Sequence, residues 1–266
     1  MARVSADYIP NGAANWARKT FWHQLMLPGV NLADKDYALA LLKIREFRPR
    51  VLWGFTSALA GLADYIQRTG EDVRACSPEL AIGWAAPVYE HEEKILKEVF
   101  KCAVTNIYGA REVGHIAGLC PQHTWHINQE NVLVECNEKD SGAEPGEILV
   151  TPLNISPMPF IRYRLGDLGR PVSSDCPCGR KLQVLKDFLG RTGEVFVTKD
   201  GRMIAPNFWC RFFMVDEQSK FVDRFQVIYR RDDWVTIRVV KKEGFSDATE
   251  VDMRRILNKN FTPDIH

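Results

Sequence analysis

The sequence predicts an α/β fold whose pattern of strands and helices changes twice along the chain. Up to about residue 110, apolar strand-like runs alternate with amphipathic helical segments, which is typical of parallel strand–helix–strand units. Short strands with little helix between them then follow, which indicates a more antiparallel or barrel-like sheet. Beyond about residue 190, strands and helices mix again and predict a small α+β unit.

The first part of the chain predicts three strands separated by helices. The predicted order is a helix over 34–47, a strand over 51–55, a helix closed by Gly70, a strand over 79–85, a helix opened by Pro87 and a strand over 103–109. The first helix should stop before Pro49, because proline disfavours helical backbone in the preceding residue. Thr56 or Ser57 is a candidate N-cap of the second helix, since a hydroxyl can accept a hydrogen bond from a first-turn N–H.

The rest of the chain predicts mainly strands. The middle part shows them in HIAGL, NVLVEC, GEILVTPL and FIRYR, punctuated by glycine and proline. The last part shows a hairpin turning at Asp200-Gly201, a helix from about Asn207, the strands RFQVIYR and WVTIRVVKK, and a helix over 248–259. Two glycines among charged residues mark a hinge in 188–194. We therefore expect a large domain over 1–188 and a small one over 189–266.

Composition narrows the class of protein. The 266 residues are 45% hydrophobic and 26% charged, with a formal net charge of +1, so we expect neither a nucleic-acid partner nor a membrane association. No apolar run reaches the roughly 18–20 residues that cross a bilayer, and the first residues do not resemble a secretory signal. The seven cysteines are an odd number in a chain too long to need disulfides, which favours a reducing cytoplasm.

Two short motifs contain candidate functional carboxylates. YGAREVG follows an apolar strand, and ligands in α/β sheets bind where strands end; Glu112 there could hold Mg²⁺, or could be a solvated turn residue. YRLGDLG places Asp167 between glycines. An ionised carboxylate only accepts hydrogen bonds, so Asp167 could bind both ribose hydroxyls, or it could simply favour the turn.

Together with two further segments, these motifs resemble the adenylate-forming ligases, in the branch of phenylacetate–CoA ligase and its capsule-biosynthesis relatives. The family pattern is Tyr-Gly-x-x-Glu, then Gly-Glu and a strand ending Thr-x-Leu, then Arg-Tyr-x-x-Gly-Asp, then Gly-Arg. This chain has YGARE at 108–112, GEILVTPL at 146–153, RYRLGD at 162–167 and GR at 190–191. The resemblance runs from about residue 50 to the C-terminus. It implies the C-terminal part of an adenylate-forming large domain followed by the small α+β domain.

The resemblance also implies an activity and its site. Such enzymes activate a small carboxylic acid with ATP and Mg²⁺ as an acyl adenylate, usually for transfer to CoA; another acyl acceptor is the alternative. By position, Tyr108 with Gly109 would lie against the adenine and Glu112, the expected catalytic residue, would reach Mg²⁺. Asp167 would bind the ribose, and Arg191 would approach the ribose or phosphate. We expect Glu112 and Asp167 to face one cleft.

Two features of the family pattern are missing from this sequence. Nothing before residue 108 resembles the Ser/Thr/Gly-rich phosphate loop. The Gly-Lys segment that contains the adenylation lysine in this family is also missing, because the sequence stops at TPDIH, before that segment could appear. We therefore expect a partial chain: a fragment, a split-gene product that a second chain completes, or a degenerate homologue. Besides a ligase, the sequence is compatible with a non-catalytic adenylate- or acyl-binding subunit, and with a zinc-braced interaction domain.

Cysteine and histidine gather in two segments, GLCPQHTWHIN and CPCG. Structural zinc takes four thiolate or imidazole ligands, usually two from each of two segments, so Cys176 and Cys178 could join a pair drawn from Cys120, His123 and His126. Free thiols and turn histidines are the alternative. The family resemblance favours Cys120, His126, Cys176 and Cys178, with His123 as the substitute.

Overall fold

The chain forms two compact units, each assembled from separate stretches. The computed structural model describes residues 1–5, 19–29, 32–137, 145–155, 158–191, 196–197, 203–204, 209, 212–213, 221–229 and 235–260. The first unit comprises Met1–Val134, Val150–Tyr163 and Pro171–Leu185, and the second comprises Glu135–Leu149, Arg164–Arg170 and Lys186–His266. The predicted domain boundary at residue 188 stays a prediction.

Most of the described strands belong to one mixed sheet. The first half of the chain contains β1 (Ala2–Ser5), β2 (Leu25–Pro28), α2 (Asp34–Phe47), β3 (Val51–Phe55), α3 (Thr56–Thr69), a 3-10 turn (Arg74–Cys76), β4 (Leu80–Trp84), α4 (Glu90–Phe100), β5 (Ala103–Ala110), β6 (Gly114–Leu119) and β7 (Trp125–Ile127). Then follow β8 (Val132–Asn137), β9 (Gly146–Pro152), β10 (Tyr163–Val172), β11 (Val184–Arg191), β12 (Phe196–Val197), β13 (Met203–Ile204), β14 (Val222–Tyr229), β15 (Val235–Lys241) and α6 (Asp247–Asn260). Within the described residues, the sheet order is β2-β1-β3-β4-β5-β6-β7-β11-β10-β9-β8, and β12 with β13 and β14 with β15 form separate pairs.

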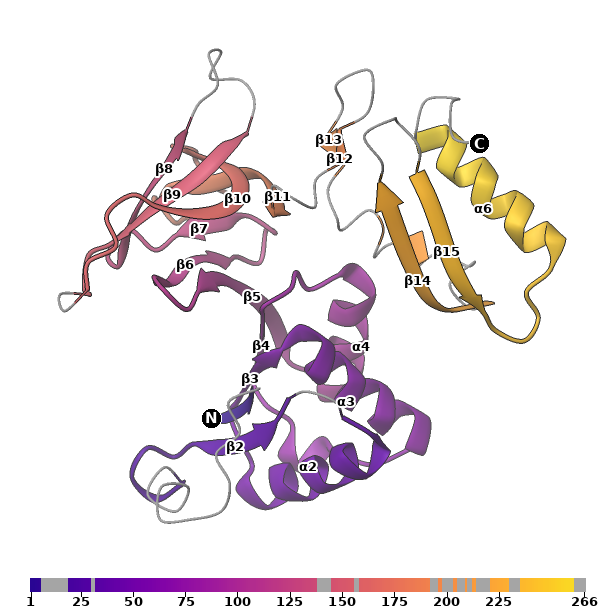
Figure 1. Cartoon of the computed structure of the whole chain (residues 1–266). Helices are drawn as coiled ribbons and strands as arrows, with labels where there is room; N and C mark the ends of the chain where they lie inside the picture. Colours follow the sequence, from indigo (N-terminus) through magenta and orange to yellow (C-terminus); the bar gives the residue numbers. More distant parts are fainter. Residues whose placement is uncertain are drawn as a thin grey trace. The chain divides into compact units, whose positions relative to one another are not determined.

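The parallel part of the sheet is confirmed. Strands β2, β1, β3, β4 and β5 pair in parallel with their neighbours, and α2, α3 and α4 lie together against them (Figure 1). Residues alternate in burial along β3 and β4, so that Leu52 and Ala81 face the helices. Leu41, Leu59, Leu62, Leu96 and Phe100 complete this core from the helices. Because each fully buried side chain of this kind contributes about 1.5–3 kcal/mol, packing fixes the helices to the sheet.

The ends of the helices follow the predicted signals with two exceptions. The helix that Pro87 was predicted to open begins only at Glu90, as α4, after the N-cap Tyr89. Helix α2 ends at Phe47, and α3 ends at Thr69, before Gly70 in the left-handed region at φ 68°. Neither Thr56 nor Ser57 caps α3, because the N-cap is Phe55 and no side chain makes the capping bond. The Thr56 hydroxyl instead contacts the carbonyl of Ala86, 3.0 Å away.

The change to antiparallel pairing near residue 110 is also confirmed. Strand β6 pairs antiparallel with β5 and β7, and β7 pairs antiparallel with β11. One predicted strand starts too early: FIRYR was expected to be extended, but β10 begins only at Tyr163. Arg162 has a φ of 51°, a left-handed conformation that interrupts an extended strand.

The C-terminal part of the second unit contains its own apolar core. Strands β14 and β15 form an antiparallel pair, and α6 runs beside them (Figure 1). The aromatic residues Trp209, Phe212 and Phe213, which precede β14, pack in this core. They contact buried residues of the two strands and the helix, namely Val222, Val235, Met253 and Leu257. The predicted hairpin is present as the pairing of β12 with β13, while its turn at Asp200-Gly201 lies outside the described residues.

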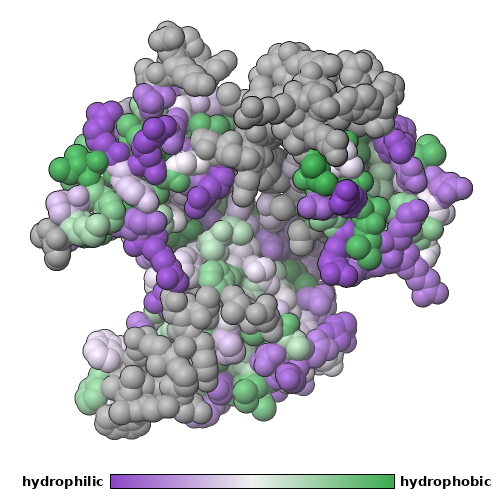
Figure 2. Space-filling view, viewed as in Figure 1, coloured by the Kyte–Doolittle hydropathy of each residue, from purple (hydrophilic) through white to green (hydrophobic). Residues whose placement is uncertain are grey.

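No helix in the described part of the chain has both the length and the apolar composition needed to cross a bilayer. On the face shown in Figure 2, hydrophilic residues are interspersed with hydrophobic ones. A few large apolar side chains are exposed, including Phe21, Trp22 and Ile161, which is ordinary for a globular surface.

Candidate functional site

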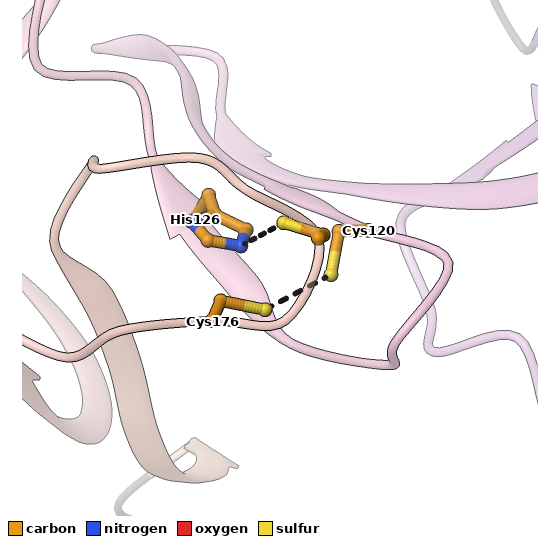
Figure 3. A group of neighbouring side chains, drawn as sticks. Cys120, His126 and Cys176 are labelled. Atoms are coloured by element: carbon orange, nitrogen blue, oxygen red, sulfur yellow. Dashed lines mark hydrogen bonds between the residues drawn. The ribbon is translucent and has the colours of Figure 1, made fainter.

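Two cysteine-containing turns of the first unit bring four potential metal ligands together. Cys120 follows β6, His126 lies in β7, and Cys176 and Cys178 come from the connection between β10 and β11. Their ligand atoms all lie within 4.8 Å of one another. Figure 3 shows Cys120, His126 and Cys176 pointing toward a common centre.

The distances in this cluster match those of a tetrahedral zinc site. The Sγ atoms of Cys120 and Cys176 are 3.8 Å apart, and Cys178 Sγ lies 3.3 Å from His126 Nε2. Zinc bonds of about 2.3 Å to sulfur and about 2.0–2.1 Å to nitrogen place two ligands of a tetrahedron about 3.8 Å (S–S) and about 3.5 Å (S–N) apart. A disulfide would need about 2.05 Å between the sulfurs, so the cluster has the spacing of metal ligands.

Hydrogen bonds favour the ionised form that metal binding requires at Cys178, whereas the pKa of Cys176 is raised above its ordinary value. The backbone N–H of Arg180 donates to Cys178, and the pKa of Cys178 is lowered to about 6 mainly for that reason. The backbone N–H of Gln122 lies 3.4 Å from Cys120 Sγ. On the histidine, Nε2 faces the sulfurs, while Nδ1 is buried without a hydrogen-bond partner among the described residues.

The structure distinguishes between the two histidines that the sequence left open. His126 is buried within the cluster, whereas His123 is 65% exposed and directs Nδ1 toward Glu93 of α4, 3.9 Å away. A tight turn causes this difference: Thr124 accepts a hydrogen bond from Cys120 N, and His123 adopts a φ of 52°. The four-residue set with His126 is therefore the one that the fold brings together.

The expected nucleotide motif lies at the end of β5. Tyr108 is half-buried, and Glu112 is exposed in the turn between β5 and β6. Gly109 has a packing reason to be glycine, because a Cβ there would lie 2.4 Å from the carbonyl oxygen of Gly114. The hydroxyl of Tyr163 donates to Glu112 Oε1 at 3.3 Å, which gives this exposed carboxylate a fixed neighbour.

A buried polar clamp fixes the loop beside this motif, after β4. Asn106 Nδ2 and Thr56 Oγ1 each lie 3.0 Å from the carbonyl oxygen of Ala86. Asn106 and Thr56 are 2% and 1% exposed, and they belong to β5 and α3. The loop also contains Ala85 at a φ of 68°, a conformation that a non-glycine residue adopts only when its surroundings impose it.

The second unit contains the other two expected nucleotide-binding residues. Asp167 in β10 and Arg191 at the end of β11 form an ion pair, with Oδ1 and Nε 3.7 Å apart. In the same unit, Arg164 forms an ion pair with Glu147, which joins the RYRLGD and GEILVTPL motifs. Asp167 is thus placed beside Arg191, while its convergence with Glu112 on one cleft stays a prediction.

Sequence reasoning missed several of these contacts. Tyr163 and Thr56 were noted only as a motif residue and a candidate cap, and Asn106 received no role. A weak signal existed for Asn106, since it is an amide in a mostly apolar strand, two residues before Tyr108 and therefore on the same side of β5.

Known proteins similar to this chain include phenylacetate-coenzyme A ligases. It is 27% identical over 218 residues to the phenylacetate-coenzyme A ligase of Thermus thermophilus, covering 77% of this chain and 48% of that protein. It is 22% identical over 213 residues to protein CapK of Staphylococcus aureus, covering 77% of this chain and 46% of that protein. The chain thus spans about half the length of these curated relatives, and no protein-family model matches it.

Solved structures show the same fold. A 2-hydroxyisobutyryl-CoA ligase in the postadenylation state superposes with a TM-score of 0.71 at 17% identity, covering 97% of this chain and 58% of that one. Coronafacic acid ligase from Pectobacterium brasiliense gives a TM-score of 0.60 at 14% identity, covering 100% and 54%. The curated relatives are phenylacetate-coenzyme A ligase and protein CapK, the solved neighbours share the fold, and the chain is therefore similar in sequence and in fold to adenylate-forming ligases.

Proposed function

We propose that this chain contributes the nucleotide-binding part of an ATP-dependent ligase. The ligase activates a small carboxylic acid as an acyl adenylate and transfers the acyl group to CoA or another acceptor. Support comes from the named activity of the relatives and from a structural neighbour whose complex contains an acyl-AMP adduct and CoA. The acid itself is unassigned.

The observation that carries the proposal is the pairing of Asp167 with Arg191. These residues come from two separate motifs, yet their charged groups lie 3.7 Å apart. A carboxylate that accepts two ribose hydroxyls, next to a guanidinium that can approach the ribose or phosphate, suits a nucleotide. In this proposal Asp167 binds the ribose and Arg191 reaches the ribose or phosphate. The adenine role of Tyr108 with Gly109 rests on the family resemblance alone.

The residues at the end of β5 also fit the magnesium ion that accompanies ATP. Mg²⁺ prefers oxygen ligands and is usually held by one or two carboxylates together with substrate phosphates. Glu112 offers an exposed carboxylate, and one hydrogen bond from Tyr163 leaves lone pairs on both oxygens for other partners. When bound, the ion supplies neutralisation of phosphate charge, and Glu112 is the side chain that would hold it.

The cysteine cluster has a separate, structural role in this proposal. Cys120, His126, Cys176 and Cys178 would hold one Zn²⁺, because their spacing and donor types suit a closed tetrahedral site. With all four positions filled by protein, the ion would brace the two turns of the first unit.

Titration of the purified chain with AMP tests the nucleotide site. Asp167→Asn removes the charged acceptor and should weaken AMP binding about 10–100-fold, since a hydrogen bond to a charged group is worth about 1.5–3 kcal/mol. Asp187→Asn is the matched control. Asp187 pairs with Arg170 across the same two strands at 2.9 Å, and its φ of 52° is one that asparagine tolerates.

The control variant should bind AMP like the wild type. Equal losses in both variants, or no AMP binding by the wild type, would count against the nucleotide site. Pyrophosphate exchange with a panel of carboxylic acids then separates the alternatives. AMP binding without exchange indicates a binding module or a subunit, and exchange restored by a second chain identifies a split ligase.

A further inference from the structure

Glu112 is an exposed glutamate in a turn, and such a side chain is ordinarily mobile. Holding a free glutamate in one conformation costs up to about 1.5–2 kcal/mol of side-chain entropy. Here its Oε1 accepts a hydrogen bond from the Tyr163 hydroxyl at 3.3 Å, across 51 positions of sequence. The contact therefore restricts the one carboxylate that the YGAREVG motif presents to solvent.

Tyr163 is itself fixed by its neighbours. The ring of Phe160 packs edge-on against it, with centroids 5.0 Å apart and planes at 68°. Just before it, Arg162 adopts the left-handed φ of 51°, a conformation that costs of order 1 kcal/mol in a non-glycine residue and persists only where surroundings impose it. The hydroxyl of Thr151 accepts a hydrogen bond from the backbone N–H of Arg162 at 2.9 Å and thereby holds this turn.

These contacts connect three motifs within the first unit. Glu112 comes from YGAREVG, Thr151 from GEILVTPL and Tyr163 from RYRLGD. The hydroxyl of Thr151 holds the backbone of Arg162, the residue before Tyr163, and the hydroxyl of Tyr163 contacts Glu112. This arrangement explains why a threonine and a tyrosine stand in segments whose assigned roles do not use them.

We infer that Tyr163 is a positioning residue that orients Glu112 for the magnesium–nucleotide complex, with Thr151 as its support. This inference rests on the proposed nucleotide site. The hydroxyl fixes one carboxylate oxygen and directs the remaining lone pairs toward the cation. Groups that hydrogen-bond to metal-binding side chains typically change metal affinity about 10–100-fold when removed.

The test compares AMP binding, which needs no metal, with ATP binding measured over a range of Mg²⁺ concentrations. Tyr163→Phe keeps the ring and its packing on Phe160 while it removes the hydroxyl. It should leave AMP affinity unchanged and should raise the Mg²⁺ concentration needed for half-maximal ATP binding about 10-fold. Glu112→Gln is the reference that should largely abolish the Mg²⁺ dependence.

Three further variants test the inference independently. Thr151→Val should reproduce part of the Tyr163→Phe effect, while Thr151→Ser, which keeps the hydroxyl, should restore wild-type behaviour. Tyr65→Phe removes a hydroxyl from α3 and should change neither titration. Melting temperatures of all variants show whether each remains folded.

The outcomes separate this inference from the proposed function. If Glu112→Gln alters the Mg²⁺ dependence and Tyr163→Phe does not, the positioning role is wrong and the nucleotide site stands. If Tyr163→Phe weakens AMP and magnesium–ATP binding equally, its role is structural and the inference is overturned. If the wild type binds no AMP, the nucleotide site fails and the inference fails with it.

Discussion

Removal of metal from the four-residue cluster should strongly destabilise the first unit. A metal ion held by the cluster would cross-link two turns, and Cys120 and Cys176 are 56 positions apart. In the chain-entropy description, a cross-link that closes a loop of this length stabilises the folded state by about 4 kcal/mol. Since 1 kcal/mol shifts the melting temperature of a chain of this size by about 2–4 °C, chelation should lower it by about 8–16 °C.

Two histidine variants provide the assay with an internal control. His126→Ala removes a ligand and should abolish stoichiometric zinc, as measured by elemental analysis, and its melting temperature should no longer respond to a chelator. His123→Ala changes a side chain three residues away that is 65% exposed and lies outside the cluster. It should retain zinc and the full chelator response, since surface substitutions usually change stability by no more than about 0.5 kcal/mol.

The chelator response matters more than the melting temperature of His126→Ala alone. His126 is buried, so its truncation also removes packing and would destabilise the fold without any metal. A wild-type chain that contains no zinc after expression with zinc supplied, and whose melting temperature is the same with and without chelator, would exclude the zinc site.

Three other substitutions test the contacts around the loop after β4 and the first turn of α4. Thr56→Val removes the hydroxyl held by the Ala86 carbonyl and should cost about 1 kcal/mol in urea unfolding, while Thr56→Ser should not; equal stabilities would contradict the clamp. Gly83→Ala would place a Cβ 2.6 Å from Thr56 Oγ1 and should cost about 1–3 kcal/mol in the same assay. Burial raises the pKa of Glu92 above its ordinary 4.5, so the stability that Glu92 contributes is present below that pH and is lost as pH rises through the folded pKa. Glu92→Gln keeps an acceptor for the backbone N–H of Tyr89 and should therefore melt higher than the wild type at about pH 7.5 but not at about pH 4; a gain at both would exclude titration as its cause.

The regular elements were predictable where their signals are local. Helix α2 has the predicted bounds, and β3 coincides with the predicted strand. Their apolar patterns lie within each element, and the stop signal of α2, Pro49, follows it directly in the sequence. The start of β10 was not predictable in the same way. FIRYR reads as a strand, but the turn at Arg162 depends on a hydroxyl of Thr151, eleven positions earlier.

The candidate site shows the same limit more clearly. Residue types alone reduced the metal ligands to five candidates, but the choice of His126 over His123 depends on the turn after β6 and on the pairing of β7 with β11. Likewise, nothing in the sequence near Thr56 indicates that its hydroxyl bonds to Ala86 instead of capping α3. Both contacts require knowledge of which strands are neighbours, and that information is not local.

The pairing of Asp167 with Arg191 suits a residue that must later release its partner. Asp167 lies within β10 and its side chain is 14% exposed, whereas Arg191 ends β11 and its side chain is 69% exposed. An ion pair with one solvated partner is worth at most about 1 kcal/mol, so its loss costs the fold little. If Asp167 binds a ribose as proposed, the hydroxyls would displace the Arg191 guanidinium at little cost to the fold. In the proposed site, Asp167 would be the anchor in the sheet, and Arg191 would be the partner that the ribose displaces.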